Sequence, residues 1–279
     1  QAEAITTCPT LDLYNTEAQR ASYDRESDGM QEWWYVCIGP QYPYPNVLMN
    51  NWPVGTRLIS WMQKAYDVDG FLVWDAMNYT TLDNNGYPVV NTYDKLTDTM
   101  TGVSDGKLFY PGTPYGLETP VASLRCIAYR DGMEDYEVLQ GLYDVYAANG
   151  LDASVALQGY YDELFSGTIT TTDETAFYGV REQVFDLLES SQGECALLYE
   201  EVSVTEDDAE IRFRLANPDA TAEAEAGELT QENGVYTLRL KSSQTDSLAV
   251  TVKAGAAEQR YERFVFGEYS RFYDAESGE

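Results

Sequence analysis

The sequence predicts an α/β fold followed by a small antiparallel β module. Two observations carry this prediction. The first half alternates buried strand, loop, helix and strand, an order that implies parallel neighbouring strands. Beyond Gly193 the chain changes to short alternating strands separated by turn residues, which is typical of antiparallel sheets. The chain has 279 residues, and we expect one domain over residues 1–192 and a second over residues 193–279.

The elements of the first half follow from the apolar pattern. Residues 4–8 are extended, and residues 32–38 (EWWYVCI) are an apolar, β-rich run that Gly39-Pro40 ends. Residues 55–66 repeat apolar side chains at helical period, and residues 71–74 form a second short buried strand. This order predicts a β-α-β unit.

The middle of the chain combines a long loop with three helices. Residues 80–119 are rich in Asn, Asp, Gly, Pro and Tyr, and a loop of this length inside a domain is usually functional. Pro120 favours the start of a helix that runs to about residue 148. A second helix is expected over residues 151–164. A third follows Thr171, which can form a capping box with Glu174.

The last part of the chain predicts strands with turns between them. The expected strands cover residues 197–204, 210–215, 235–240 and 247–252. Asn233-Gly234 is a hairpin turn signal. Residues 254–279 are charged and aromatic, and their pattern predicts no element.

Charge restricts the partners. Lys and Arg number 17 against 47 Asp and Glu, which gives a net charge of −30. Such a surface repels phosphate backbones and anionic membranes, so nucleic-acid binding is excluded as a function class. Neutral substrates fit best, and 23 Tyr with 5 Trp offer stacking surfaces of the kind that sugars use. The oligomeric state stays open.

The missing residue types restrict the chemistry. The chain has no His, which removes Ser-His and Cys-His catalysis and His-ligated metals. The 4 Cys form no CxxC pair, and we expect no metal and no other cofactor. No run of 18 apolar residues exists, so no membrane span is expected. The chain opens with Gln1, and we interpret it as a piece of a longer protein, secreted or cytoplasmic.

Several strings in the first half resemble one family. They are WWYVCIGPQYPYPN (33–46), DGFLVWDAMNY (69–79), DGKLFYPG (105–112) and SLRCIAYRDGMEDYEVL (123–139). In this order they resemble the C-terminal half of the glycoside hydrolase family 123 catalytic domain, a bacterial domain class, over about residues 1–142. Ile127 departs from the Glu found in many members, which affects one helix salt bridge.

The resemblance implies the C-terminal portion of a (β/α)₈ TIM barrel followed by a β-sandwich. It implies a retaining β-N-acetylgalactosaminidase in which the acetamido oxygen of the substrate attacks the anomeric carbon. In the family an adjacent Asp-Glu pair orients the acetamido group and protonates the leaving oxygen. That pair lies on an earlier strand, so we expect it upstream of this chain and name no catalytic residue within it. A non-catalytic carbohydrate-binding or structural protein on the same barrel is the alternative.

Three acidic pairs within the chain have structural interpretations. Asp173-Glu174 stands at a helix start, where acidic residues favour the helix dipole. Asp162-Glu163 lies inside a helix and is interpreted as a solvated face. Glu134-Asp135 belongs to RDGMEDYE, where Arg130 and Glu134 are i,i+4 neighbours and predict an ion pair that anchors the helix.

The candidate substrate-binding residues lie at or just after predicted strand ends. They are Trp74, Asp75, Tyr35, Tyr42, Tyr44, Asn46, Asn78 and Tyr14. Trp74 either stacks beneath a sugar ring or is a core residue, and Asp75 either orients a sugar hydroxyl or caps the next loop. Tyr35 suits a hydrogen bond to the acetamido group if its face is interior. The tyrosines and amides on the following loops are expected to contact substrate at the rim, with Asn15 beside Tyr14.

Overall fold

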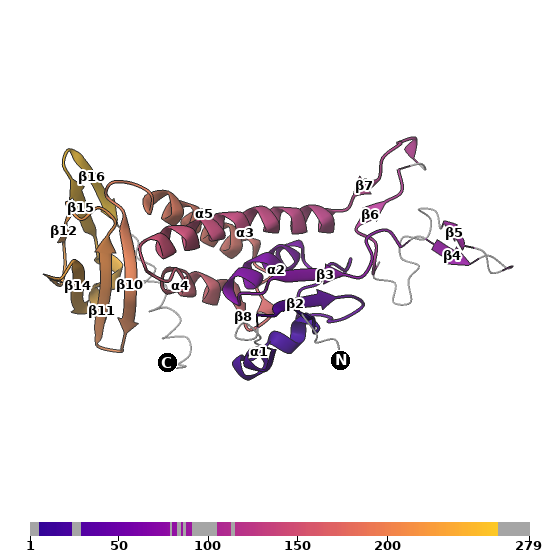
Figure 1. Ribbon diagram of the computed structural model, residues 1–279, viewed down its shortest axis with the longest axis horizontal. Coiled ribbons are helices and arrows are strands. Elements are labelled where there is room, and N and C mark those ends of the chain that lie inside the picture. Colours follow the sequence, from indigo (N-terminus) through magenta and orange to yellow (C-terminus); the bar gives the residue numbers. More distant parts are fainter. Residues whose placement is uncertain are drawn as a thin grey trace. The chain divides into compact units, whose positions relative to one another are not determined.

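The computed structural model describes residues 6–23, 29–78, 80–82, 85, 88–90, 105–112 and 115–261 (Figure 1). The chain divides into two compact units. The first comprises Gln1–Tyr136 with Phe165–Glu174, and the second comprises Glu137–Leu164 with Thr175–Glu279. No described helix is both long and apolar enough to cross a membrane.

A parallel sheet lies at the centre of the first unit. It has three strands in the order β1-β2-β3, formed by Thr6–Thr7, Gln31–Val36 and Gly70–Val73, and Figure 1 shows β2 and β3 side by side. Both neighbouring pairs run parallel, with Trp34 opposite Phe71. The predicted β-α-β unit is therefore confirmed. The described residues form this open sheet and no closed barrel.

The other elements of the first unit are short, except for two helices. They are η1 (Leu11–Tyr14), α1 (Glu17–Tyr23), α2 (Pro53–Ala65), β4 (Thr80–Leu82), β5 (Pro88–Val90), β6 (Phe109–Tyr110), β7 (Val121–Ala122), the first half of α3 (Leu124–Ala148), β8 (Phe165–Ser166) and β9 (Ile169–Thr170). Pro53 occupies the first turn of α2, where its missing N–H has no partner to lose. The prediction that a helix begins at Pro120 was wrong by four residues, because Val121 and Ala122 pair with β6. Residues 91–104 of the long predicted loop lie outside the described residues.

The two faces of the parallel sheet differ in burial. Trp34 and Val36 have no exposed surface, and the Phe71 ring lies 5.1 Å from the Tyr129 ring of α3. The helices therefore cover this face. On the other face Leu72 is 39% exposed and Tyr35 is half-buried. The face that carries Tyr35 and Leu72 is thus the open one.

Helices α2 and α3 meet in a close crossing. A Cβ on Gly132 would lie 2.4 Å from the backbone oxygen of Arg57, so only glycine permits this approach. Beside it, the Arg57 guanidinium donates to both oxygens of Asp135 at 2.6 and 2.9 Å, and Trp61 Nε1 donates to the same carboxylate at 3.1 Å. The Asp135 side chain is fully buried. The segment RDGMEDYE therefore contributes a glycine and a buried carboxylate to this crossing.

The Glu134 prediction is confirmed only in part. Arg130 and Glu134 approach to 3.8 Å, but their side chains are 63% and 71% exposed. Arg130 also contacts Asp131 at 2.5 Å. A surface ion pair contributes little to stability. The anchor of this helix is therefore Asp135 with Arg57.

The second unit combines helices with two antiparallel sheets. Its helices are the rest of α3, α4 (Ser154–Leu164) and α5 (Glu174–Ser190). Its sheets have the orders β10-β11-β14-β13 and β12-β15-β16. The strands are β10 (Leu197–Val204), β11 (Asp208–Leu215), β12 (Thr221–Ala224), β13 (Glu228–Glu232), β14 (Val235–Lys241), β15 (Val250–Ala254) and β16 (Ala257–Tyr261), and a 3₁₀ helix, η5 (Ser242–Ser247), follows β14.

The predicted strands of this unit are confirmed, except that the one predicted over residues 247–252 begins at Val250 because Ser247 belongs to η5, and the pattern missed three others. Residues 197–204 form a strand with the predicted bounds. Asn233 and Gly234 both have positive φ, 52° and 82°, and they join β13 to β14 as the turn signal predicts. Strands β12, β13 and β16 were not predicted, because they alternate half-buried and exposed side chains without a strongly apolar face.

Candidate functional site

Trp74 directly follows β3, at the carboxyl end of the parallel sheet. Its side chain is 49% exposed, so it is not a core residue. The indole Nε1 donates a hydrogen bond of 2.9 Å to Asp105. One edge of the ring is thereby fixed while about half of its surface faces solvent. An exposed, oriented indole is the geometry that stacking on a sugar requires.

The segment 105–108 runs antiparallel to residues 76–78 and holds the indole in place. The Asn78 N–H donates to the Gly106 oxygen and the Leu108 N–H to the Ala76 oxygen, both at 2.8 Å. Gly106 has φ +70°, and a Cβ there would lie 2.8 Å from Cζ2 of Trp74. We call Asp105–Leu108 the Trp74 clamp.

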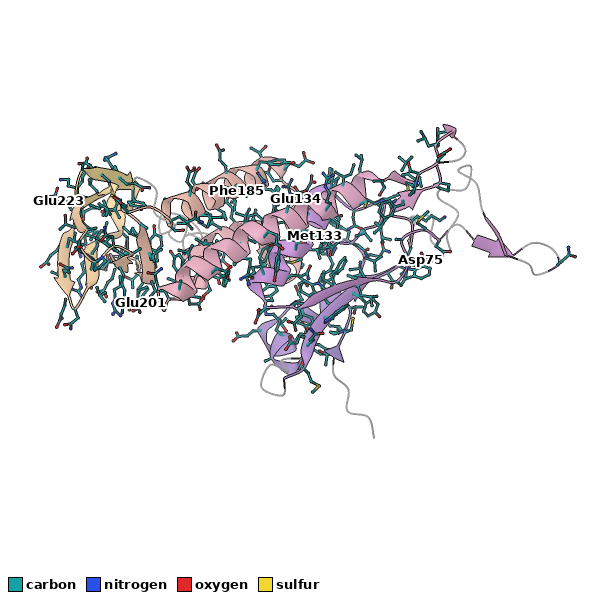
Figure 2. The ribbon with its side chains drawn as sticks, turned by 45° about the horizontal axis from the view of Figure 1, so that its top comes forward. Asp75, Met133, Glu134, Phe185, Glu201 and Glu223 are labelled. Atoms are coloured by element: carbon teal, nitrogen blue, oxygen red, sulfur yellow. The ribbon has the colours of Figure 1, made fainter. Side chains whose placement is uncertain are left out.

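Asp75 and Asn78 lie beside this clamp. The Asp75 Oδ1 accepts a hydrogen bond of 2.9 Å from the Met77 N–H, which is the capping contact that the sequence left as one of two alternatives. Asp75 and Asn78 are half-buried, and both have their Cβ within 3.3 Å of the Cβ position of Gly106. Figure 2 shows Asp75 well apart from Met133 and Glu134 of α3. The structure therefore brings Trp74, Asp75 and Asn78 together.

The loop after β2 carries the next group of predicted residues. Tyr42 is 67% exposed and Tyr44 is half-buried. Asn46 is fully buried, and its Nδ2 donates to the Cys37 and Pro40 oxygens at 3.0 and 2.8 Å. Asn46 thus holds the loop from inside, and any effect of its side chain on a ligand would pass through the loop.

Arg125 connects this loop to the Trp74 clamp. The guanidinium is buried and donates to the Val47 oxygen at 3.1 Å and to the Lys107 oxygen at 2.6 Å. It also contacts the Tyr110 hydroxyl at 3.1 Å. One side chain at the start of α3 therefore joins the loop that follows β2 to the Trp74 clamp.

The remaining two candidates lie elsewhere on the sheet. Tyr35 is half-buried on the open face, opposite Leu72 of β3. Tyr14 is buried, and its hydroxyl donates to Glu32 at 3.4 Å, near the amino end of β2. Burial raises the pKa of the Tyr14 phenol, and the Glu32 carboxylate raises it further. Tyr14 is one of the residues around a cavity of about 570 Å³ that also borders Glu32 and Asp69, so it stands at the end of the sheet away from Trp74.

Two of the three acidic pairs, Asp162-Glu163 and Asp173-Glu174, make local contacts. The Thr171 hydroxyl accepts from the Asp173 N–H at 3.1 Å, and α5 begins at Glu174, so Thr171 turns the chain before the helix rather than capping it through Glu174. Asp162 accepts from Gln158 one turn earlier on α4 at 2.6 Å. Across the described ranges, no three His, Cys, Asp or Glu side chains gather as metal ligands.

Sequence reasoning missed three residues of this region. Asp105 holds Trp74 from 31 residues away, and Arg125 reaches Val47 across 78 residues. Trp52, which the sequence pattern did not single out, is 55% exposed directly before α2. The uncharged, aromatic composition of residues 33–56 was the available signal for Trp52.

Comparison with known proteins bears on the same part of the chain. The family model described as glycoside hydrolase 123, catalytic domain, matches residues 3–142. Among curated proteins, no significant match was found. The matched region contains the parallel sheet, the Trp74 clamp and the Arg125 contacts. With half of its length matched by this model, the chain belongs to glycoside hydrolase family 123.

Proposed function

We propose that the protein hydrolyses glycans containing N-acetylgalactosamine and retains anomeric configuration by a substrate-assisted mechanism. The observation that carries the proposal is the exposed Trp74 at the carboxyl end of a parallel strand, within the matched catalytic domain. Active sites of (β/α)₈ enzymes lie at that end. We further propose that β1, β2 and β3 belong to such a barrel and that the two C-terminal sheets form a sandwich, with the domain boundary near residue 192.

The residues near Trp74 have distinct roles in this proposal. The indole face stacks on the apolar C–H face of the sugar ring. Asp75 and Asn78 border the indole and supply oxygens and an amide for ring hydroxyl groups. Tyr35 hydrogen-bonds the acetamido group from the open face of the sheet. Tyr42 and Tyr44 contact the part of the glycan that is attached to the N-acetylgalactosamine unit. Tyr14 and Asn46 act by supporting the fold around these groups.

The acid-base step needs carboxylates that the described strand ends do not provide. Among the described residues, the ends of β1, β2 and β3 carry no adjacent Asp-Glu pair. A substrate-assisted mechanism uses one carboxylate to orient the acetamido group and one acid to protonate the leaving oxygen. It departs from the usual two-carboxylate scheme because the nucleophile is the acetamido oxygen of the substrate and not a carboxylate of the protein. This observation also favours the alternative, a carbohydrate-binding protein without catalysis on the same fold.

Binding and turnover, measured separately, test the proposal. The 279-residue chain should bind N-acetylgalactosamine in a calorimetric titration, and Trp74→Ala should weaken that binding. Tyr178→Ala, which removes another exposed ring on α5, is the matched control. The same chain should release no nitrophenol from a nitrophenyl β-N-acetylgalactosaminide.

The outcomes separate the alternatives. Failure of the sugar to bind would contradict the proposed function. Turnover by this chain would place the acid within it, with Asp75 the first residue to replace. If a longer protein with additional upstream sequence binds the sugar but does not hydrolyse the nitrophenyl glycoside, the result would support the non-catalytic alternative.

A further inference from the structure

We propose that the loop over residues 41–52, which follows β2, is a second sugar-binding surface that holds a further residue of a neutral oligosaccharide. This inference rests on the proposed function, in which an N-acetylgalactosamine unit lies at Trp74. It places Trp52 in contact with a second sugar unit, apart from the Trp74 site, so that the ligand extends beyond one terminal sugar.

The loop exposes apolar side chains although its interior is well packed. Tyr42 is 67% exposed, Trp52 is 55% exposed and Met49 is 48% exposed. Between them Asn46 and Leu48 have no exposed surface at all. A loosely folded loop would leave all of these residues partly exposed. Three large apolar side chains exposed on one short, packed segment support its use as a binding surface.

The two exposed rings lie on segments that run beside each other. The Asn50 Nδ2 donates to the Gln41 Oε1 at 3.3 Å, and the Asn51 Nδ2 donates to the Tyr44 oxygen at 3.0 Å. The side-chain amides of Gln41, Asn50 and Asn51 therefore lie along the two segments that carry Tyr42 and Trp52. A pyranose needs this combination, because its C–H face stacks on a ring while its hydroxyl groups exchange hydrogen bonds with amides.

The composition of the loop selects a neutral ligand. Residues 33–56 contain no Asp, Glu, Lys or Arg, although charged residues make up 23% of the chain. An anionic ligand would meet no cation there and would be repelled by the net charge of −30. A cationic ligand would meet no carboxylate within the loop. A neutral sugar needs neither.

Arg125 places this surface in a fixed position relative to Trp74. The same guanidinium binds the Val47 oxygen inside the loop and the Lys107 oxygen inside the Trp74 clamp. The two carbonyl groups are therefore held next to each other. A single oligosaccharide can then contact both Trp74 and the loop.

The test compares a short and a long ligand by isothermal titration calorimetry on the 279-residue chain. The probes are N-acetylgalactosamine and a neutral linear tetrasaccharide that ends in β-linked N-acetylgalactosamine. We expect the tetrasaccharide to bind about fivefold to tenfold more tightly, the gain that one further aromatic contact provides. Trp52→Ala should remove this gain and leave the affinity for the single sugar unchanged.

Three further variants control the experiment. Trp52→Phe keeps a ring and should retain part of the gain, which separates stacking from a folding defect at the start of α2. Tyr178→Ala should keep both affinities. Trp74→Ala should lower the affinity for both ligands.

Each outcome decides one question. Unchanged tetrasaccharide affinity in Trp52→Ala, with normal binding of the single sugar, would overturn the second surface and leave the proposed site at Trp74 standing. A different result would support the second surface and overturn the proposed function. In that case tetrasaccharide binding would need Trp52, would not need Trp74, and would not be competed by N-acetylgalactosamine. Binding of neither ligand by the unaltered chain would overturn both.

Discussion

Replacing Asp135 by asparagine should lower the free energy of unfolding by about 3–5 kcal/mol, the cost of breaking a buried ion pair from one side. The carboxylate is fully buried, and the side chain of its partner Arg57 is only 12% exposed. The substitution removes the negative charge between the guanidinium and the Trp61 indole, both of which donate to it. Because so little water reaches the pair, solvent screening offsets little of this loss.

Urea denaturation followed by tryptophan fluorescence measures this change, since Trp61 reports directly on the pair. The transition midpoint should shift with little change in its slope. Glu134→Gln is the matched control, because it alters the neighbouring residue, whose side chain is 71% exposed, and should leave the midpoint unchanged. Arg57→Met combined with Asp135→Leu should recover most of the lost stability, because apolar replacement of both partners leaves no buried charge. A loss below about 1 kcal/mol in Asp135→Asn would refute the assignment of this pair as the anchor of α3.

Three further predictions concern the site and the helix crossing. Trp74→Ala should weaken N-acetylgalactosamine binding about tenfold, equivalent to about 1.4 kcal/mol, with a small change in thermal midpoint because the ring is 49% exposed; equal binding by titration would remove Trp74 from the site. Asp105→Ala should free the indole and raise its acrylamide quenching, while Asp105→Asn, which keeps an acceptor, should restore the quenching of the unaltered protein. Gly132→Ala should cost about 1–3 kcal/mol in urea denaturation, because its Cβ would lie 2.4 Å from the Arg57 oxygen and the helices would have to separate; retention of full stability would contradict the close crossing.

Local pattern was sufficient for the first β-α-β unit and for the strand over residues 197–204. Each of these elements has an apolar pattern that extends through most of its length, so the pattern identifies the type of element even where it does not fix the ends. Asn233-Gly234 is a dipeptide that directly favours the positive φ of a hairpin turn. The start of α3 could not be predicted in the same way. Val121 and Ala122 pair with Phe109 and Tyr110, and that pairing competes with the helix that Pro120 favours.

The site shows the same division between near and distant contacts. The sequence placed Trp74 at the end of a strand, but its hydrogen bond to Asp105 depends on how the intervening residues fold back. The i,i+4 spacing of Arg130 and Glu134 is visible in the sequence, whereas the partner of Asp135 lies 78 residues away. Charge spacing along one helix therefore pointed to an exposed pair, and only the fold identifies the buried one.

The contacts of α3 affect the entropy and the kinetics of ligand binding. Arg125 joins its first turn to the loop after β2 and to the Trp74 clamp, and Gly132 and Asp135 lie where the same helix crosses α2. The backbone at Val47 and Lys107 is therefore held before a sugar binds, which reduces the conformational entropy that binding would cost there. Association should therefore proceed in a single kinetic phase, without a slow rearrangement after encounter. Substitutions at Arg125 would then appear as an entropic penalty on binding, although the residue itself is buried beneath the surface that the ligand touches.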